Sequence, residues 1–198
     1  HSLLAWALVC GPLLGLAAHA FTRLTTWARA SAPPNGWLVP LCVASFTAMG
    51  LLAMALPQLL GNGKGPAQLG FANELGLGLA ASLLVCKLLV TTAALRSGAH
   101  GGLLTPCLAI GALLAMLLGG AWSLLGPGPS SGICALVGGT AFLAVSMRMP
   151  VTAIVLVMEM TAFHHDMLIP VGLAVAGATV AGRWAEARWA VPARPGTV

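Results

Sequence analysis

Apolar runs long enough to cross a lipid bilayer fill most of this chain and limit what it can fold into. Only 7% of the 198 residues are charged, whereas a soluble domain carries about 25% charged residues. A helix needs about 20 mostly apolar residues to span the hydrocarbon core of a bilayer. Runs of that kind begin near Ser2, Trp37, Leu75 and Pro106. The sequence therefore predicts an all-α membrane protein.

Glycine, proline and short polar segments separate the expected helices. Membrane-length spans are predicted over residues 2–21, 37–60, 75–95 and 106–125, and shorter apolar helices over residues 133–146, 150–161 and 168–182. A polar extension is expected over residues 22–29, after the first span. Several runs are too short to cross a bilayer or are broken by glycine and proline. This pattern is typical of transporters built from inverted repeats.

The most constrained stretch lies between the third and fourth spans. Residues 97–106 read Ser-Gly-Ala-His-Gly-Gly-Leu-Leu-Thr-Pro and contain no acidic side chain. The glycines permit backbone angles that other residues avoid, and Pro106 fits the first turn of a helix. The backbone N–H groups of residues 102–105 are therefore expected to lie unpaired at the positive end of a helix dipole, where they favour an anion. Such a backbone is tolerated at membrane depth only where it lines a protein cavity.

Three blocks of this sequence resemble the CLC family of chloride channels and proton/chloride antiporters. The central block reads G-x-x-G-G-x-x-x-P over residues 98–106 and continues L-x-x-G to Gly111, with Leu104 where the family has phenylalanine. The block at residues 141–161 has a small-residue helix, an R-x-P break and a helix that ends in E-x-T. Residues 60–66 resemble a glycine-rich turn before a short re-entrant helix. The blocks follow the order of the C-terminal half of the family fold.

The resemblance implies one half of a CLC-like inverted repeat, with broken and re-entrant helices and an anion path. The site residues that it implies are Gly102, Leu103 and Leu104, whose backbone N–H groups would contact chloride or another small anion. The family's gating glutamate and an anion-coordinating serine belong to the N-terminal half of the fold. The tyrosine that the last helix of the family supplies is missing, because this chain has no tyrosine. Its hydroxyl is lost or replaced.

Two basic side chains are candidate modulators of this site. Lys87 lies inside the third span, where a charge must face protein or water. It either extends its ammonium group to polar neighbours or contributes to the field along the ion path. His100 lies two residues before the expected amides, and an ordinary histidine titrates near pH ~6.5. It either faces the anion or turns away from it.

The resemblance and the charge pattern also imply partners and an orientation. The membrane region is expected over residues 1–184 in a bilayer, with the N-terminal half of the same fold as a partner, and a tail over residues 185–198. Arginines at the ends of the spans place that tail in the cytosol. In the family, the last helices form a homodimer interface. Here it falls on residues 150–182, with a small-residue face: Gly172, Ala174, Ala176 and Gly177.

Composition and motifs argue against other classes of function. The net charge of +5 is spread between apolar runs, which excludes a nucleic-acid-binding surface. No phosphate loop, nucleophile elbow or catalytic carboxylate pair is present, so neither an enzyme nor a cofactor is expected. The five cysteines are scattered and resemble buried apolar residues. His164, His165 and Asp166 form an interfacial loop in preference to a metal site. Glu159 is interpreted as a partnered structural residue rather than a proton carrier.

Two other functions stay open at the level of sequence. The glutamates that separate a channel from an antiporter lie outside this sequence, and a fluoride-exporting relative of the family is an alternative to a chloride transporter. The other alternative is a non-conducting scaffold subunit that keeps the helices and has lost transport. A Gly-x-Glu-Gly-Pro-like motif upstream of His1 would favour transport.

Overall fold

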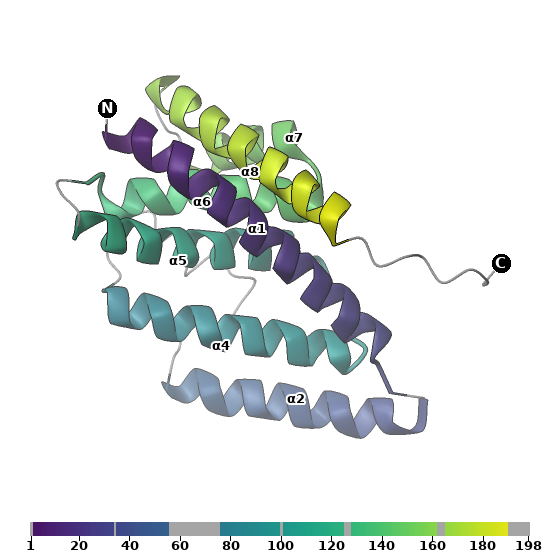
Figure 1. Cartoon of the computed structure of the whole chain (residues 1–198). Coiled ribbons are helices and arrows are strands. Elements are labelled where there is room, and N and C mark those ends of the chain that lie inside the picture. The colour runs from purple at the N-terminus through teal and green to yellow at the C-terminus, as the bar shows by residue number, and fades with distance from the viewer. Residues whose placement is uncertain are drawn as a thin grey trace.

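The computed structural model describes residues 2–33, 35–55, 76–99, 101–124, 128–161 and 165–189, which form helices joined by short turns. Figure 1 shows the arrangement, with α1 crossing in front of a central layer of helices. The α-helices are α1 (Ser2–Ala30), α2 (Asn35–Ala55), α4 (Leu77–Arg96), α5 (Leu104–Ser123), α6 (Ser131–Met147), α7 (Pro150–Thr161) and α8 (Leu168–Arg188). A 3-10 turn at His165–Met167 precedes α8.

Five of these helices are long and apolar enough to cross a membrane, which confirms the predicted all-α membrane protein. They are α1, α4, α5, α8 and the Trp37–Met54 part of α2. The helices α6 and α7 are apolar but contain only 17 and 12 residues. At about 1.5 Å per residue, the latter rises only ~18 Å. Short non-helical segments join α4 to α5 and α6 to α7.

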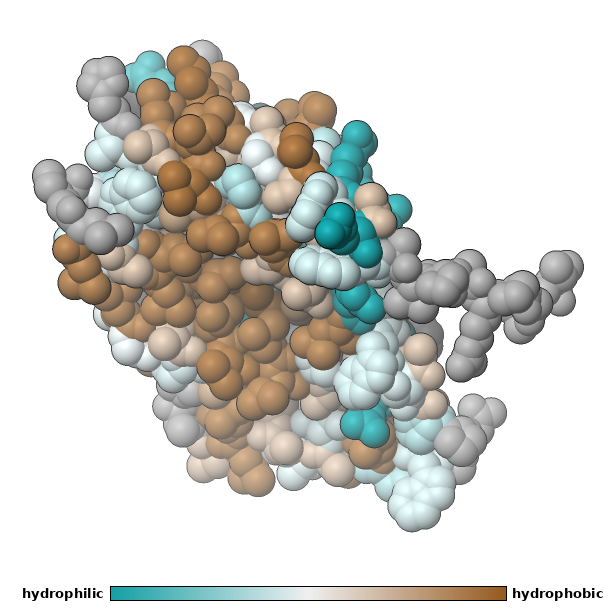
Figure 2. Space-filling model, in the orientation of Figure 1, coloured by the Kyte–Doolittle hydropathy of each residue, from teal (hydrophilic) through white to brown (hydrophobic). Residues whose placement is uncertain are grey.

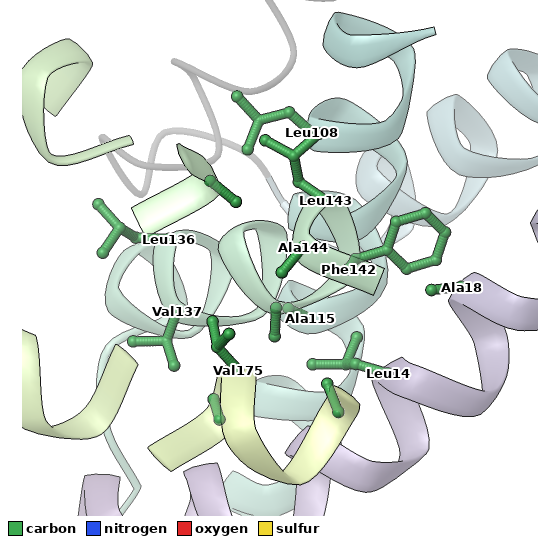
Figure 3. Packing of buried hydrophobic residues seen from close by; sticks show 14 of the residues in the cluster. Leu14, Ala18, Leu108, Ala115, Leu136, Val137, Phe142, Leu143, Ala144 and Val175 are labelled. Carbon is green, nitrogen blue, oxygen red and sulfur yellow. The ribbon is translucent and has the colours of Figure 1, made fainter. Parts of the chain in front are cut away.

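The core lies between α5 and α6, and small residues bring the two backbones together. A Cβ atom added to Gly111 would lie 2.5 Å from Phe142 Cβ, and one added to Gly138 would lie 2.3 Å from Ala115 Cβ. Figure 3 shows the buried residues around this contact, with Leu14 and Ala18 of α1 reaching into the same cluster. Helices in a membrane associate through such close packing, because the lipid is as apolar as their side chains and the hydrophobic effect does not drive them together.

The helices α1 and α8 lie against each other through a second set of small residues. A Cβ atom on Gly15 would lie 2.2 Å from the carbonyl oxygen of Ala178. One on Gly177 would lie 3.2 Å from Pro12 Cδ. The expectation that Ala174 and Gly177 belong to an outward dimer face is therefore wrong, because both contact α1 of the same chain. Of the four small residues expected there, only Gly172 and Ala176 keep open surroundings.

Several helix boundaries differ from the sequence prediction. The first helix continues through the expected polar extension to Ala30, and α8 continues past Gly182 to Arg188. The expected boundary after residue 184 therefore falls inside a helix. Long polar side chains are compatible with these ends, because they reach the interface while their stems stay apolar. The glycine-rich block at residues 60–66 and residues 190–198 lie outside the described residues.

The surface separates an apolar belt from a polar end. Figure 2 shows hydrophobic side chains across most of the visible face and hydrophilic ones gathered on the right, where α1 and α8 end in Figure 1. The helix ends carry Arg29, Arg96 and Arg188. The guanidinium of Arg96 lies 5.5 Å from the centre of the Trp27 ring. Aromatic and basic residues together are typical of the level of the lipid headgroups.

Candidate anion site

A tight turn after α4 leads the chain back toward the start of α5. The backbone N–H of Ser97 donates to Ala93 O over 2.9 Å, and that of Gly98 donates to Leu95 O over 3.2 Å. Gly98 has a φ of +81°, which favours glycine at the end of a helix. The Ser97 hydroxyl donates to Ala94 O over 2.8 Å and is therefore not available to a ligand. The turn explains why the sequence has glycine at position 98.

The start of α5 presents backbone donors, as the sequence predicts. Leu103 precedes the first helical residue and forms no side-chain cap. The first backbone hydrogen bond of the helix joins Cys107 N to Leu103 O over 2.9 Å. The N–H groups of residues 102–105 donate to no backbone oxygen of the described chain. Pro106 lies in the first turn, where its missing N–H leaves no gap in the helix ladder.

One of these four residues, Leu103, lines a cavity of about 180 Å³ between α1, the start of α5 and the end of α6. Its lining consists of Phe21, Thr22, Thr25, Thr26, Arg29, Leu103, Ser146 and Met147. One water needs only about 10–15 Å³ of such space, so a hydrated anion fits. The exposed guanidinium of Arg29 at the end of α1 adds positive charge at the rim. The lining thus combines a helix N-terminus with a cation and holds no carboxylate.

The hydroxyl groups around this cavity are not equivalent. Thr22 donates to Ala18 O over 2.9 Å, and Thr25 and Thr26 donate to Thr22 O over 2.9 and 2.8 Å. Ser146 differs, because it is only 9% exposed and donates to no backbone oxygen of the described chain, while the Cys107 thiol is its side-chain neighbour. Sequence reasoning did not single out this serine as part of the site. The available signal was a hydroxyl at the end of an otherwise apolar, small-residue helix.

The predicted site residues do not all line the same cavity. Leu103 lines the cavity. Leu104 instead borders a small apolar gap on the side of α7, of about 10 Å³. Gly101 and Gly102 are exposed, with no atom within 4 Å of where their Cβ would be. The three expected amides therefore form one turn of backbone, with Leu103 nearest to the cavity.

The two predicted modulators have different outcomes. Lys87 is 5% exposed and lies on the buried face of α4 with Leu83 and Thr91. It does not line the cavity beside Leu103, so a role for its charge along an ion path stays a prediction. His100 lies outside the described residues, and its role also stays a prediction.

The partner expected for Glu159 stays a prediction. The side chain of Glu159 is exposed in the last turn of α7. It forms no salt bridge with any described residue, whereas Glu186 pairs with Arg148. The candidate metal ligands His164 and His165 cannot be placed, since residues 162–164 and the side chain of His165 lie outside the described part of the structure.

Comparisons with known proteins identify the family of this chain. The family described as "Voltage gated chloride channel" matches residues 1–183. The chain is 34% identical over 133 residues to the H(+)/Cl(-) exchange transporter ClcA of Salmonella paratyphi A, covering 66% of this chain and 28% of that protein. It is 32% identical over 185 residues to the protein of the same name in Cronobacter sakazakii, covering 87% of this chain and 38% of that protein.

A third relative gives the same result. The chain is 35% identical over 133 residues to the H(+)/Cl(-) exchange transporter ClcA of Klebsiella pneumoniae, with 66% of this chain and 28% of that protein covered. The chain spans roughly a third of the length of these relatives. Their names describe transport rather than catalysis. With the family match over residues 1–183, they show that this chain is a membrane protein that belongs to the voltage-gated chloride channel family.

Proposed function

We propose that the complete protein carries chloride across a membrane, with the anion held by the backbone N–H groups of Gly102, Leu103 and Leu104. The observation that carries this proposal is the start of α5, where Leu103, one of the residues with an unpaired backbone N–H group, lines a cavity that Arg29 also lines and no carboxylate does. A backbone site depends on conformation rather than on side-chain identity. The replacement of the family's phenylalanine by Leu104 therefore alters the pore wall and leaves the donors in place.

The transport mode is either a channel or a proton-coupled antiporter. The relatives from Salmonella, Cronobacter and Klebsiella are named as H(+)/Cl(-) exchangers, which supports the antiporter. A fluoride exporter would use the same backbone donors, since they respond to negative charge and size. A scaffold subunit would keep the buried contacts of α5 and α6 and need no open cavity beside Leu103. The open cavity therefore favours transport over the scaffold.

The proposal also includes the surroundings of the chain. We propose a homodimer formed through residues 150–182, a cytosolic location for the ends of α1 and α8, and the N-terminal half of the fold as the other wall of the path. The exposed apolar side chains of Val151, Val155 and Ile169 supply surface for lipid or for a second copy. The arginines at the helix ends support the cytosolic orientation.

Flux from liposomes that contain the complete protein tests the function. Chloride efflux with opposite proton movement would support an antiporter, and chloride efflux that does not move protons would support a channel. Fluoride efflux with little chloride efflux would identify a fluoride exporter. Absence of flux for both anions, with the protein folded and inserted, would contradict transport and favour the scaffold.

A further inference from the structure

A second polar cavity, of about 300 Å³, lies among α1, α6, α7 and α8. Its charged and titratable lining residues are His19, Arg148, Arg183 and Glu186. Gly182 and Pro150 also line the cavity. The role proposed for the start of α5 does not involve these four residues. The cavity therefore needs an explanation of its own.

The charges in this second cavity add up to a binding site for an anion. Arg148 pairs with Glu186, whereas Arg183 forms no salt bridge within the described chain. Two guanidinium groups and one carboxylate leave one positive charge when His19 is neutral. The first residue of α7, Pro150, lines the cavity, so the positive end of that helix dipole adds to the attraction.

His19 contributes a polar atom without a partner. Its Nε2 is buried and forms no hydrogen bond with the described residues. The ring stacks on Trp189 with a centroid separation of 6.3 Å, which fixes its orientation. The two threonines of the lining already use their protons, since Thr22 donates to Ala18 O and Thr179 donates to Val175 O. The donors that remain for a ligand in this cavity are therefore side-chain N–H groups.

The position of the cavity points to a lipid. Trp184 and Trp189 are 55% and 50% exposed at the end of α8, and Trp189 stacks on His19 of the cavity wall. Exposed tryptophans are typical of the headgroup level of a bilayer. Basic pockets between membrane helices on the cytoplasmic side bind the headgroups of anionic lipids. Guanidinium groups also match the geometry of phosphate oxygens.

We propose that this second cavity binds the phosphate of an anionic phospholipid headgroup. Arg183 supplies the main contact, α7 directs its N-terminus to the phosphate, and the ring of His19 forms part of the wall. Glu186 opposes binding, because it brings a negative charge into the cavity and occupies Arg148. The lipid site is separate from the start of α5, so it stands whether or not the protein transports chloride.

Binding of phosphatidylglycerol to the complete protein tests the proposal. The protein is placed in phosphatidylcholine nanodiscs with increasing phosphatidylglycerol, and bound lipid is measured by native mass spectrometry and by the shift in the unfolding temperature. Arg183→Gln is expected to weaken phosphatidylglycerol binding about tenfold, the size of one hydrogen-bonded contact to a charged group. Glu186→Gln is expected to strengthen binding. A folding defect cannot produce that second change.

Arg188→Gln is the matched control, because Arg188 lies in the same helix and carries the same charge but does not line the cavity. Its guanidinium lies 5.9 Å from the centre of the Trp184 ring, and its loss is expected to leave binding unchanged. Equal effects of Arg183→Gln and Arg188→Gln would overturn the proposal in favour of general surface charge. In a second experiment, inorganic phosphate is added to the protein in pure phosphatidylcholine nanodiscs, and the shift in the unfolding temperature is measured. An equal shift with inorganic phosphate alone would overturn the lipid assignment.

Discussion

Arg148 ends α6 in a left-handed backbone conformation, and its guanidinium donates a hydrogen bond to the carboxylate of Glu186 in α8. Its φ is 56°, the one positive value at a non-glycine residue in the described chain. The backbone N–H of Arg148 donates to Val145 O and that of Met149 donates to Ala144 O, which caps the helix. Pro150 then starts α7. This geometry explains the R-x-P break seen in the sequence.

The left-handed conformation predicts an unusual order of stability among variants at position 148. For an L-residue it costs about 1–2 kcal/mol, which glycine avoids. The ion pair is exposed and is worth at most ~1 kcal/mol. Arg148→Gly is therefore expected to be more stable than Arg148→Ala by about 1 kcal/mol in thermal unfolding of the complete protein. Equal stability of the two variants would show that the backbone is not strained there.

The contact between α1 and α8 predicts a strong effect of adding one methyl group. Gly15→Ala places a carbon 2.2 Å from the carbonyl oxygen of Ala178, so the two helices must move apart. We expect a loss of about 1–3 kcal/mol, the usual effect of overpacking. Gly78→Ala in α4 is the control, because no atom of the described residues lies within 4 Å of its Cβ position. A control variant as destabilised as Gly15→Ala would mean that helix packing is not the cause.

The proposed homodimer predicts that a large side chain on the outer face of α8 separates the protomers. Ala176 is exposed, so Ala176→Trp is expected to yield folded monomers in cross-linking and light-scattering experiments. Gly177→Trp is unsuitable, because it would collide with Pro12 inside one chain. Val85→Trp, on the exposed side of α4, is the control and is expected to leave the dimer intact. Unchanged dimers of Ala176→Trp would place the interface elsewhere.

Most helices could be predicted from the sequence because apolar length and helix-breaking residues leave few alternatives. The range of α7 was predicted without error, since Pro150 starts it. The outward face of α8 could not be predicted. The membrane-spanning part of α8 is apolar on all sides, so the sequence has no polar stripe that would show which side contacts lipid. The contact of Gly177 with Pro12 depends on how α1 crosses α8, which is a property of the tertiary structure.

The anion site shows the same division between local and tertiary information. The donors at the start of α5 follow from glycine and proline within ten residues of sequence. The cavity beside them also needs Thr25 and Arg29, which are more than seventy residues earlier in the chain. Ser146 comes from a third helix. A local sequence pattern predicts the break before α5. It does not predict that the three segments meet there.

An incomplete path predicts that the chain has no transport activity by itself. A transport path between inverted repeats needs both of them. Residues 1–198 alone, reconstituted in liposomes, are therefore expected to release neither chloride nor fluoride. Selective anion efflux from those liposomes would contradict the view that the N-terminal half supplies the other wall.

The central claim is tested most directly by calorimetry. The chloride affinity of the complete protein is compared with that of its Leu103→Pro variant. Proline deletes the N–H of Leu103, and the preceding Gly102 tolerates the restriction that proline imposes. Leu103→Ala keeps the N–H and removes only the side chain. The account predicts affinity at least tenfold weaker for Leu103→Pro, as expected for one hydrogen bond to an ion, and nearly unchanged for Leu103→Ala. Wild-type affinity in a folded Leu103→Pro variant would contradict an anion site built from the backbone of α5.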